Sequence, residues 1–415
     1  MSRPMSRPLS PPSSRRVAQV IGCAVVASLF GAACSSSSPK AQPAGLSASQ
    51  ANALNQQQYS PADRAAATLL APAAGSFLKG KVTVSTLAST TPASGDVNPY
   101  AVWPVTENVG SLKSGDVLVD NFNNQSNDQG TGTTIVDVHP DGTVSVFAQL
   151  PSMIAGCPGG VGLTTAMVQL KTGWVLVGSL PTTDGKVDTS GAGCLIELSP
   201  AGQVAGVLAG PYLDGPWDAT VADNGATATL FVTNTLIGVK AAGTASLAQG
   251  TVARLTLAQT ATTAPTVTAE TNVATGLPER EDAAALIKGP TGLVLTSDGT
   301  LYIGDNLGNR VASVPNAVTR TDSAGTGTTI STGGQLANPL GMALAPNGDL
   351  LVANATNGKI VEITPQGKQV GEYYAIQDVG QDPPGNGDLF GIAVNQAGNG
   401  VLFVKDDTNT LALLQ

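Results

Sequence analysis

A short apolar phrase that ends on a polar residue occurs six times along the chain. The clearest copy, GDLLVAN, lies at Gly348–Asn354. The other copies are Gly115–Asn121, Gly173–Ser179, Thr229–Asn234, Gly299–Asp305 and Gly400–Asp406. They recur at intervals of about 50–70 residues, a period typical of architectures that repeat a small four-stranded sheet. The repeat therefore predicts an all-β fold, a six-bladed β-propeller.

Each copy contains one apolar anchor, which we place in the second strand of its blade. The anchors are Val119, Val177, Val232, Ile303, Val352 and Val404. First strands are predicted before the anchors, at 108–112, 165–169, 218–222, 292–295, 341–344 and 391–394. Third strands are predicted after them, at 135–138, 195–198, 252–257, 311–314, 360–363 and 411–414. Turns rich in Pro and Gly, such as 140–142, then lead into the fourth strands.

The two ends of the repeat array are complementary. The sixth repeat stops at Gln415 without a fourth strand, while Val82–Leu87 alternates like a strand and has no blade of its own. We therefore expect this N-terminal strand to pair with 411–414 and close the last blade, which would leave the ring without an open edge.

Residues 1–34 have the form of an export signal. They carry four arginines and no acid, and an apolar stretch from Val17 to Ala33 leads to Cys34. This arrangement is typical of a secretory signal peptide. Cys34 followed by four serines resembles a bacterial lipoprotein start, so lipidation at Cys34 is expected. Ser14-Arg15-Arg16 also resembles a twin-arginine signal, and the type of signal stays open.

The remaining chain divides into two parts. Residues 35–79 are rich in Ser, Ala, Gln and Pro and predict a flexible tether with one short helix at 62–70. Residues 80–415 contain the repeats and form the predicted propeller domain. The expected location is extracytoplasmic, in the periplasm or cell envelope, with the membrane reached only through a lipid on Cys34.

The net charge limits the classes of binding partner that we expect, and the cysteine content predicts a disulfide. Removal of the four N-terminal arginines takes the formal net charge from −9 to −13. An acidic surface disfavours nucleic acid and anionic membranes as partners. Two cysteines remain after the signal, Cys157 and Cys194, both in the second repeat. An exported protein can oxidise such a pair, so we predict a disulfide. We expect a monomer that binds a small molecule or an envelope protein.

Two of the repeats resemble the NHL-repeat propellers. The likeness lies in the motifs Asn338–Gly341, Pro346–Asn354 and Asn357–Ile360, and recurs from Gly289 to Val311. It is good over 289–371, fair over 389–415 and weak in the first three blades. The resemblance implies the propeller fold. It does not specify an activity, because this superfamily holds lactonases, lyases and non-enzymatic binding proteins.

The chain has a single histidine, His139, which follows a predicted third strand beside a Pro-Asp-Gly turn. We interpret it as a surface turn residue away from the channel. Streptogramin B lyases, peptidylglycine amidating lyases and paraoxonases resemble this fold but depend on histidines, so their chemistry is not expected. A Ser-His-Asp triad and a zinc site built on histidines are excluded for the same reason.

A polar residue with an oxygen acceptor follows every anchor by two positions. These residues are Asn121, Ser179, Asn234, Asp305, Asn354 and Asp406, and they are predicted to end the second strands at one rim of the channel. One interpretation is that they cap the strand ends and bond the following turns. The other is that some of them bind a hard cation, since Ca²⁺ is held by carboxylate and amide oxygens.

The predicted strand starts place three more oxygen ligands at that rim, namely Glu107, Asn108 and Asp218. With Asn234 and Asp305 they form a candidate site for Ca²⁺ or Mg²⁺. The gluconolactonase and senescence-marker family resembles this arrangement, because it holds one metal with Glu, Asn and Asp at the channel mouth. Trp103, Trp217 and Phe390 lie near strand starts and either stack on a ligand or pack between blades. Loop acids such as Glu279 and Asp388 are interpreted as solvated.

Three functions remain open from the sequence. The first is a non-catalytic exported propeller that binds a ligand or a protein on its channel rim. The second is a divalent-metal-dependent lactonase or related hydrolase, in which a cation polarises a lactone carbonyl and a carboxylate activates water. The third is a purely structural envelope protein. The sequence contains fold signals throughout and no complete catalytic motif.

Overall fold

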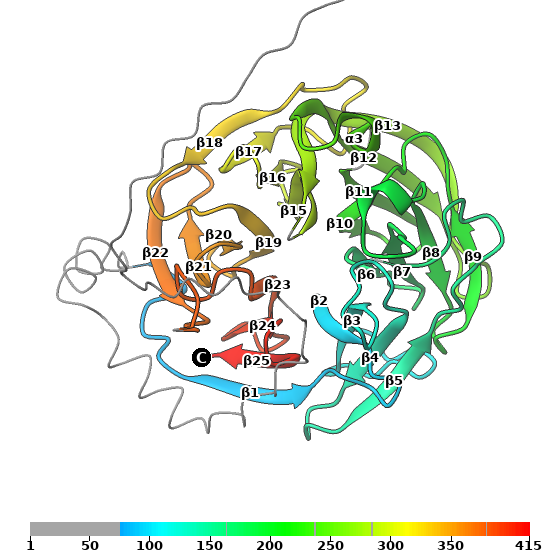
Figure 1. Ribbon diagram of the computed structural model, residues 1–415, viewed down its shortest axis with the longest axis horizontal. Helices are drawn as coiled ribbons and strands as arrows, with labels where there is room; N and C mark the ends of the chain where they lie inside the picture. Colours follow the sequence, from blue (N-terminus) through cyan, green and yellow to red (C-terminus); the bar gives the residue numbers. More distant parts are fainter. Residues whose placement is uncertain (1–74, 163, 236–237, 284, 379) are drawn as a thin grey trace, which may run out of the picture. The chain divides into compact units, whose positions relative to one another are not determined.

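The computed structural model describes residues 75–415, except 163, 236–237, 284 and 379. These residues form six antiparallel sheets arranged as blades around a central channel (Figure 1). The predicted signal peptide, Cys34 and the helix at 62–70 lie outside the described residues. No helix in the described part of the chain is long and apolar enough to cross a bilayer.

The first strand of each blade lines the channel. These inner strands are β2 (Val97–Pro104), β6 (Met167–Gln169), β10 (Pro216–Asp223), β15 (Pro290–Leu295), β19 (Pro339–Leu344) and β23 (Leu389–Val394). The second strands are β3 (Val117–Asn123), β7 (Val175–Ser179), β11 (Thr227–Asn234), β16 (Leu301–Asp305), β20 (Leu350–Asn354) and β24 (Val401–Lys405). All six predicted anchors lie in these second strands with no exposed surface, which confirms the repeat assignment.

The outer half of each blade completes the sheet. The third strands are β4 (Thr134–Val138), β8 (Cys194–Leu198), β12 (Leu247–Ala258), β17 (Arg310–Val314), β21 (Lys359–Ile363) and β25 (Thr410–Leu414). The outermost strands are β5 (Val144–Gln149), β9 (Val204–Leu208), β13 (Thr266–Asp282), β18 (Thr328–Thr332), β22 (Gln369–Tyr374) and, for the sixth blade, β1 (Val84–Ser89).

The ring closes as the sequence predicts. Strand β1 pairs antiparallel with β25, with Val84 opposite Leu414 and Ser89 opposite Thr410. The main-chain amides of Val82 and Thr83 also bond the carbonyl of Gln415. Figure 1 shows the N-terminal strand beside the C-terminal one. The last sheet is therefore built from both ends of the domain.

Blade one departs from the prediction. Its inner strand is β2 (Val97–Pro104), not 108–112, which lies in the connection from β2 to β3. The prediction placed each first strand about ten residues before its anchor, and in blade one the connection between the first two strands is longer than that spacing allows. Proline lacks an amide donor, but an inner strand needs partners on one side only, so proline is tolerated there.

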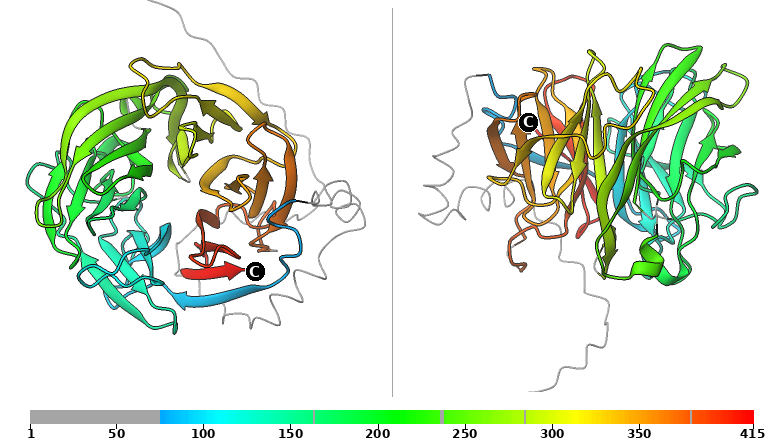
Figure 2. Two further views of the ribbon diagram at one scale, coloured as in Figure 1. Left: turned by 180° about the vertical axis from the view of Figure 1, so that it is seen from behind. Right: turned by 90° about the horizontal axis from the view of Figure 1, so that it is seen from above.

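Blade three carries an insertion that the repeat did not predict. Strands β12 and β13 span 12 and 17 residues, and β14 (Leu286–Lys288) adds a fifth strand to the sheet. The one-turn helix α3 (Val239–Ala242) precedes β12 and contacts β13. Figure 2 shows α3 at the end of this long hairpin. A 3₁₀ turn, η1 (Val187–Thr189), lies in the connection from β7 to β8 and contacts α3.

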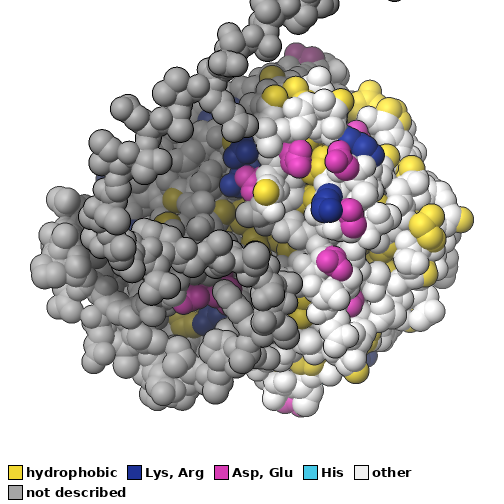
Figure 3. All heavy atoms as spheres, viewed as in Figure 1, with side chains coloured by type: hydrophobic (Ala, Val, Ile, Leu, Met, Phe, Trp, Pro, Cys, Tyr) yellow, Lys and Arg dark blue, Asp and Glu magenta, His cyan; other side chains and the backbone are white. Residues whose placement is uncertain are grey.

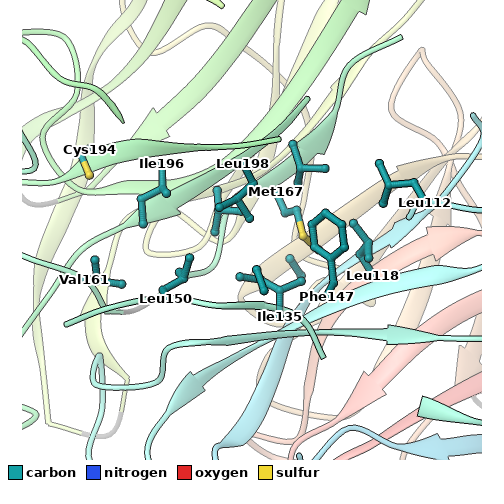
Figure 4. Packing of buried hydrophobic residues seen from close by; sticks show 14 of the residues in the cluster. Leu112, Leu118, Ile135, Phe147, Leu150, Val161, Met167, Cys194, Ile196 and Leu198 are labelled. Atoms are coloured by element: carbon teal, nitrogen blue, oxygen red, sulfur yellow. The ribbon is translucent and has the colours of Figure 1, made fainter. Parts of the chain in front are cut away.

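Apolar side chains fill the space between neighbouring blades. Between blades one and two, Leu118, Ile135 and Phe147 face Met167 and Ile196 (Figure 4). Cys157 and Cys194 belong to the same cluster and are joined by a disulfide that closes a separation of 37 residues. The cluster thus combines apolar burial with a covalent link inside blade two.

Candidate functional site

We call the rim at which β3, β7, β11, β16, β20 and β24 end the upper rim, and the opposite rim the lower rim. Ser179, Asn234, Asp305 and Asn354 end their second strands at the upper rim, Asn121 lies two residues before the end of β3, and none of the five has exposed surface. Asp406 follows β24 and is partly exposed. The side chains of the first five bond neighbouring segments of the protein, whereas Oδ1 of Asp406 is buried without a hydrogen-bond partner among the described residues.

Asn234 and Asn354 each bond the segment that leads into their own blade. The Asn234 amide donates to the carbonyl of Tyr212 at 3.0 Å and accepts from the amide of Asp214 at 3.0 Å. Asn354 makes the equivalent pair with the carbonyl of Gln335 and the amide of Ala337. For Asn234 and Asn354, these hydrogen bonds agree with the interpretation that the residues cap the ends of the second strands.

Asp305 is committed to an ion pair. Its Oδ2 accepts from Nε of Arg310 at 2.8 Å, and its Oδ1 accepts from the amide of Gly308 at 2.8 Å. Both side chains are largely buried. The carboxylate charge is therefore already balanced within blade four.

Glu107 and Asn108 lie at the lower rim. Because β2 ends at Pro104, both residues follow the inner strand instead of preceding it. Asn108 is exposed and accepts a hydrogen bond from the amide of Ser114. The structure therefore does not bring these two residues to Asn234 and Asp305, and placing them at the upper rim was wrong.

The expected metal set does not fit a cation. Its five members, Glu107, Asn108, Asp218, Asn234 and Asp305, are divided between the two rims. The Asn234 amide and the Asp305 carboxylate have protein partners that a metal would have to displace. We therefore assign no metal chemistry to this set.

Aromatic side chains form a buried layer at the upper end of the channel. Tyr100 stacks on Phe390 with ring centroids 5.2 Å apart and meets Phe122 and Trp217 edge to face. The indole Nε1 of Trp217 donates to the Tyr100 hydroxyl at 2.7 Å. The cluster is completed by Leu180, Val187, Val239, Leu286 and Ile287. Trp217 and Phe390 thus pack against neighbours, and the inserted segments of blades two and three contribute to the layer.

The channel below this layer encloses about 410 Å³. Tyr100 belongs to both the aromatic layer and the channel wall, so the layer forms the floor of the channel. The wall continues along the inner strands to Thr106, Leu344 and Gln396 at the lower rim, where Leu344 is 38% exposed. The channel therefore extends to the lower rim, opposite to the rim that the sequence analysis favoured.

The wall is mainly apolar, with a few polar groups. Among the described lining residues, Asp218 is the only one with a carboxylate. Trp103 on β2 and Thr165 before β6 also line the channel, and the indole Nε1 and the hydroxyl Oγ1 are buried without a hydrogen-bond partner in the described part of the protein. Trp103, Thr165 and Asp218 thus come from blades one, two and three, respectively.

Asp218 is held by main-chain amides. Its Oδ1 accepts from Ala219 at 2.8 Å and its Oδ2 from Leu293 at 2.9 Å. Burial nevertheless raises the pKa of Asp218 to about 7, because the amide bonds offset only part of the cost of desolvating the charge. Near neutral pH this carboxyl group can both accept and return a proton.

A second carboxyl group lies beneath the floor. Asp120 on β3 is fully buried, and its Oδ1 accepts from the amides of Tyr100 and Ala101. Burial raises the pKa of Asp120 well above its usual range, with a contribution from the charge of Asp218. Burial likewise raises the pKa of Tyr100. Both shifts favour the neutral forms of these groups, which lie at the channel floor.

Sequence reasoning identified Asp218 and Trp103 but not the site that they share. Thr165 and Asp120 carry no motif, and their positions follow only from the ring geometry. Two loop acids were also misjudged, since Glu279 and Asp388 are 0% and 1% exposed instead of solvated. Figure 3 shows that charged side chains are sparse on the visible described surface.

No protein-family model and no curated protein matches the chain. Solved structures do resemble it. A gluconolactonase from Xanthomonas campestris is 14% identical, with a TM-score of 0.50 over 84% of this chain and 92% of its own. Regucalcin, a calcium-binding protein from Agrobacterium tumefaciens, is 12% identical, with a TM-score of 0.48 over 79% and 92%. A streptogramin B lyase is 15% identical, with a TM-score of 0.45 over 80% and 97%. At such identities the likeness to the gluconolactonase shows the fold alone, a six-bladed β-propeller.

Proposed function

We propose that the central channel is a small-molecule site and that the protein hydrolyses a lactone or a related ester there. The observation that carries this proposal is Asp218, a channel carboxyl group whose pKa of about 7 suits a general base. A pocket of this size, mostly apolar with few polar groups, is typical of small-ligand sites. Export from the cytoplasm, with a lipid on Cys34, remains part of the proposal.

The reaction needs a base and hydrogen-bond donors, and residues of the channel wall carry both kinds of group. Trp103 Nε1 and Thr165 Oγ1 lack a protein acceptor but are buried in the wall, so they bond a substrate oxygen once these side chains turn toward the channel. Asp218 takes a proton from water as the water oxygen bonds to the carbonyl carbon. The ring C–O bond then breaks, and the leaving oxygen takes the proton from Asp218, giving a hydroxy acid. The donors stabilise negative charge on the carbonyl oxygen.

A second function, binding without catalysis, is favoured by a different observation. The side chains of Asn234, Asn354 and Asp305 bond protein groups at the upper rim, so these three residues need no ligand or metal there. A propeller of this kind could hold an uncharged ligand in the channel. Capture of a ligand without turnover would identify this second function.

The test is hydrolysis of a panel of neutral lactones and esters by the purified protein and by Asp218→Asn. The variant keeps the size of the side chain and removes the base, so we expect turnover to fall about 100-fold or more. Asp322→Asn changes an exposed acid outside the channel and should retain the parental rate. Equal turnover by Asp218→Asn and the parent would refute the role of Asp218.

A further inference from the structure

Three side chains with metal-ligand chemistry meet at the lower rim of blade one. Asp116 directly precedes β3, Asp137 lies in β4, and His139 directly follows β4. The register pairs Val117 with Val138 and Leu118 with Asp137, so the three residues occupy adjoining positions on neighbouring strands. One ligand atom from each lies within 4.8 Å of the other two. The group is separate from the channel site.

The burial of the two carboxylates calls for a positive partner. Asp116 and Asp137 are each 3% exposed. Oδ1 of Asp137 is buried and has no hydrogen-bond partner among the described residues. In that part of the chain neither aspartate forms an ion pair with a lysine or arginine; the one basic partner is His139. Two adjacent buried carboxylates are costly unless a cation or a shared proton compensates them.

The histidine is oriented as a ligand would be. Its Nδ1 lies 3.0 Å from Oδ2 of Asp116, and its Nε2 lies 3.3 Å from Oγ of Ser145. In the tautomer that donates from Nε2 to Ser145, the lone pair of Nδ1 faces the carboxylates. A metal-bound imidazole usually donates its second N–H to an oxygen in this way, which fixes the ring.

We infer that Asp116, Asp137 and His139 bind one divalent transition-metal ion of the Zn²⁺ or Mn²⁺ class. An imidazole nitrogen with two carboxylate oxygens suits these ions, whereas Ca²⁺ prefers oxygen ligands alone. The His139 side chain is 32% exposed, which gives an ion and its remaining water ligands access from solvent. The unpartnered Oδ1 of Asp137 gains a partner when the ion binds.

The site would act on stability. It joins β3, β4 and the turn into β5, so an ion held there links three consecutive segments of blade one. An ion that binds the folded chain more tightly than the unfolded chain raises the unfolding free energy by mass action. The melting temperature should therefore rise with Zn²⁺ concentration.

A second acidic group gives an internal comparison. Asp378, Asp388 and Asp407 also lie within reach of one another, with oxygen ligands only. Gln381 already donates to Asp388 and Asp407. If the metal binds to this second group instead of to the site with His139, substitution of Asp378 will weaken binding and substitution of His139 will not.

The experiment uses tag-free protein that has been stripped with chelator and dialysed, because His139 is the only histidine in the chain and a histidine tag would itself bind the probe. Calorimetry with Zn²⁺ should give one ion per chain and a higher melting temperature. His139→Asn and Asp137→Asn should each weaken the affinity by about tenfold or more. Asp141→Asn in the adjacent exposed turn and Asp378→Asn should bind as the parent does.

A variant that fails to fold would lose metal binding for a reason unrelated to the site. A second measurement therefore uses the unaltered protein. The NMR signals of the single imidazole should shift in proportion to bound Zn²⁺ up to one equivalent. Absence of Zn²⁺ binding at tens of micromolar, or one-to-one binding that leaves the imidazole signals and the affinity of His139→Asn unchanged, would overturn the inference.

Discussion

Oδ2 of Asp218 in blade three accepts a hydrogen bond from the main-chain amide of Leu293 in blade four, with 2.9 Å between the two atoms. The same carboxyl group accepts from Ala219 in its own strand. Asp218 therefore joins two neighbouring inner strands and is fixed in the channel wall. A base held in this way needs little reorganisation when a substrate binds.

Buried carboxyl groups make the fold more stable at mildly acidic than at alkaline pH. Burial raises the pKa of Glu197 to about 7, and burial with the charge of Asp214 raises that of Glu279 to about 8. The folded state then binds more protons than the unfolded state between pH about 4.5 and 8. Stability is complete below the unfolded pKa and is lost as pH rises through the folded pKa.

We therefore expect the melting temperature to fall steadily from pH 5 to pH 8.5 in calorimetry. Glu197→Gln combined with Glu279→Gln should flatten this dependence. Glu270→Gln, which changes an exposed residue of β13, should leave the dependence intact. A melting temperature that rises over this range would contradict the assignment.

Glu362 holds the segment before β1 against blade five. Its carboxylate accepts from the amides of Phe77 and Leu78 at 2.6 and 2.9 Å and from the hydroxyl of Ser76. Burial opposes its ionisation, but these hydrogen bonds prevail and lower the pKa of Glu362. Residues that the sequence assigned to a tether thus contact the propeller.

Glu362→Gln should lower the unfolding free energy by about 1–3 kcal/mol, because the amide replaces a carboxylate that four donors face, the fourth being Nδ2 of Asn347. Denaturant unfolding measures the loss, with Glu270→Gln as the matched control. Cleavage near Ser76 in limited proteolysis should also become faster. Unchanged stability and unchanged proteolysis would mean that these contacts contribute nothing.

Deletion of residues 1–88 should destabilise the domain much more than deletion of residues 1–74. The longer deletion removes most of β1 and exposes the edge of β25, whose Leu411 and Leu414 are fully buried. Thermal unfolding of the two truncated proteins measures the difference. Equal melting temperatures would show that closure by β1 does not hold the ring.

The disulfide between Cys157 and Cys194 should contribute about 3–4 kcal/mol in the chain-entropy model for a loop of this length. Cys157→Ser, Cys194→Ser and the double variant should therefore unfold at similarly reduced denaturant concentration. Reductant should weaken the parent and leave the double variant unaffected. Recovery of two alkylated thiols from exported, unreduced protein would contradict the bond.

The fold was accessible from the sequence because each blade repeats the same local pattern. An apolar run bounded by turn residues, such as Leu350–Asn354, is recognisable as a strand in the sequence. The sixth repeat lacks a fourth strand and the N-terminal segment has no blade, and together these two facts predict how the ring closes. The inner strand of blade one was placed at 108–112 instead of Val97–Pro104, because the connection to its second strand is longer than the spacing used for the other blades. The insertion around β13 and β14 has no counterpart in the repeat and could not be found by comparing copies.

The candidate site was harder to predict from the sequence than the fold, because its composition depends on which rim of the propeller each residue reaches. Asn234 and Asp305 have side-chain oxygens that could bind a metal. In the fold, however, main-chain loop groups bond both side chains, and Arg310 forms an ion pair with Asp305. Trp103, Thr165 and Asp218 are far apart in sequence and meet only because inner strands of successive blades adjoin. His139, identified as a surface turn residue, lies beside two buried aspartates that no spacing rule connected to it.

The most direct test of the channel proposal is the pH dependence of kcat/KM for hydrolysis of a neutral lactone. If Asp218 is the base in the free protein, kcat/KM should rise with pH through an apparent pKa near 7, and Asp218→Asn should abolish that rise together with most of the activity. Hydrolysis that Asp218→Asn performs with the parental rate and pH profile would contradict the account, as would a channel that neither binds nor hydrolyses any member of the panel.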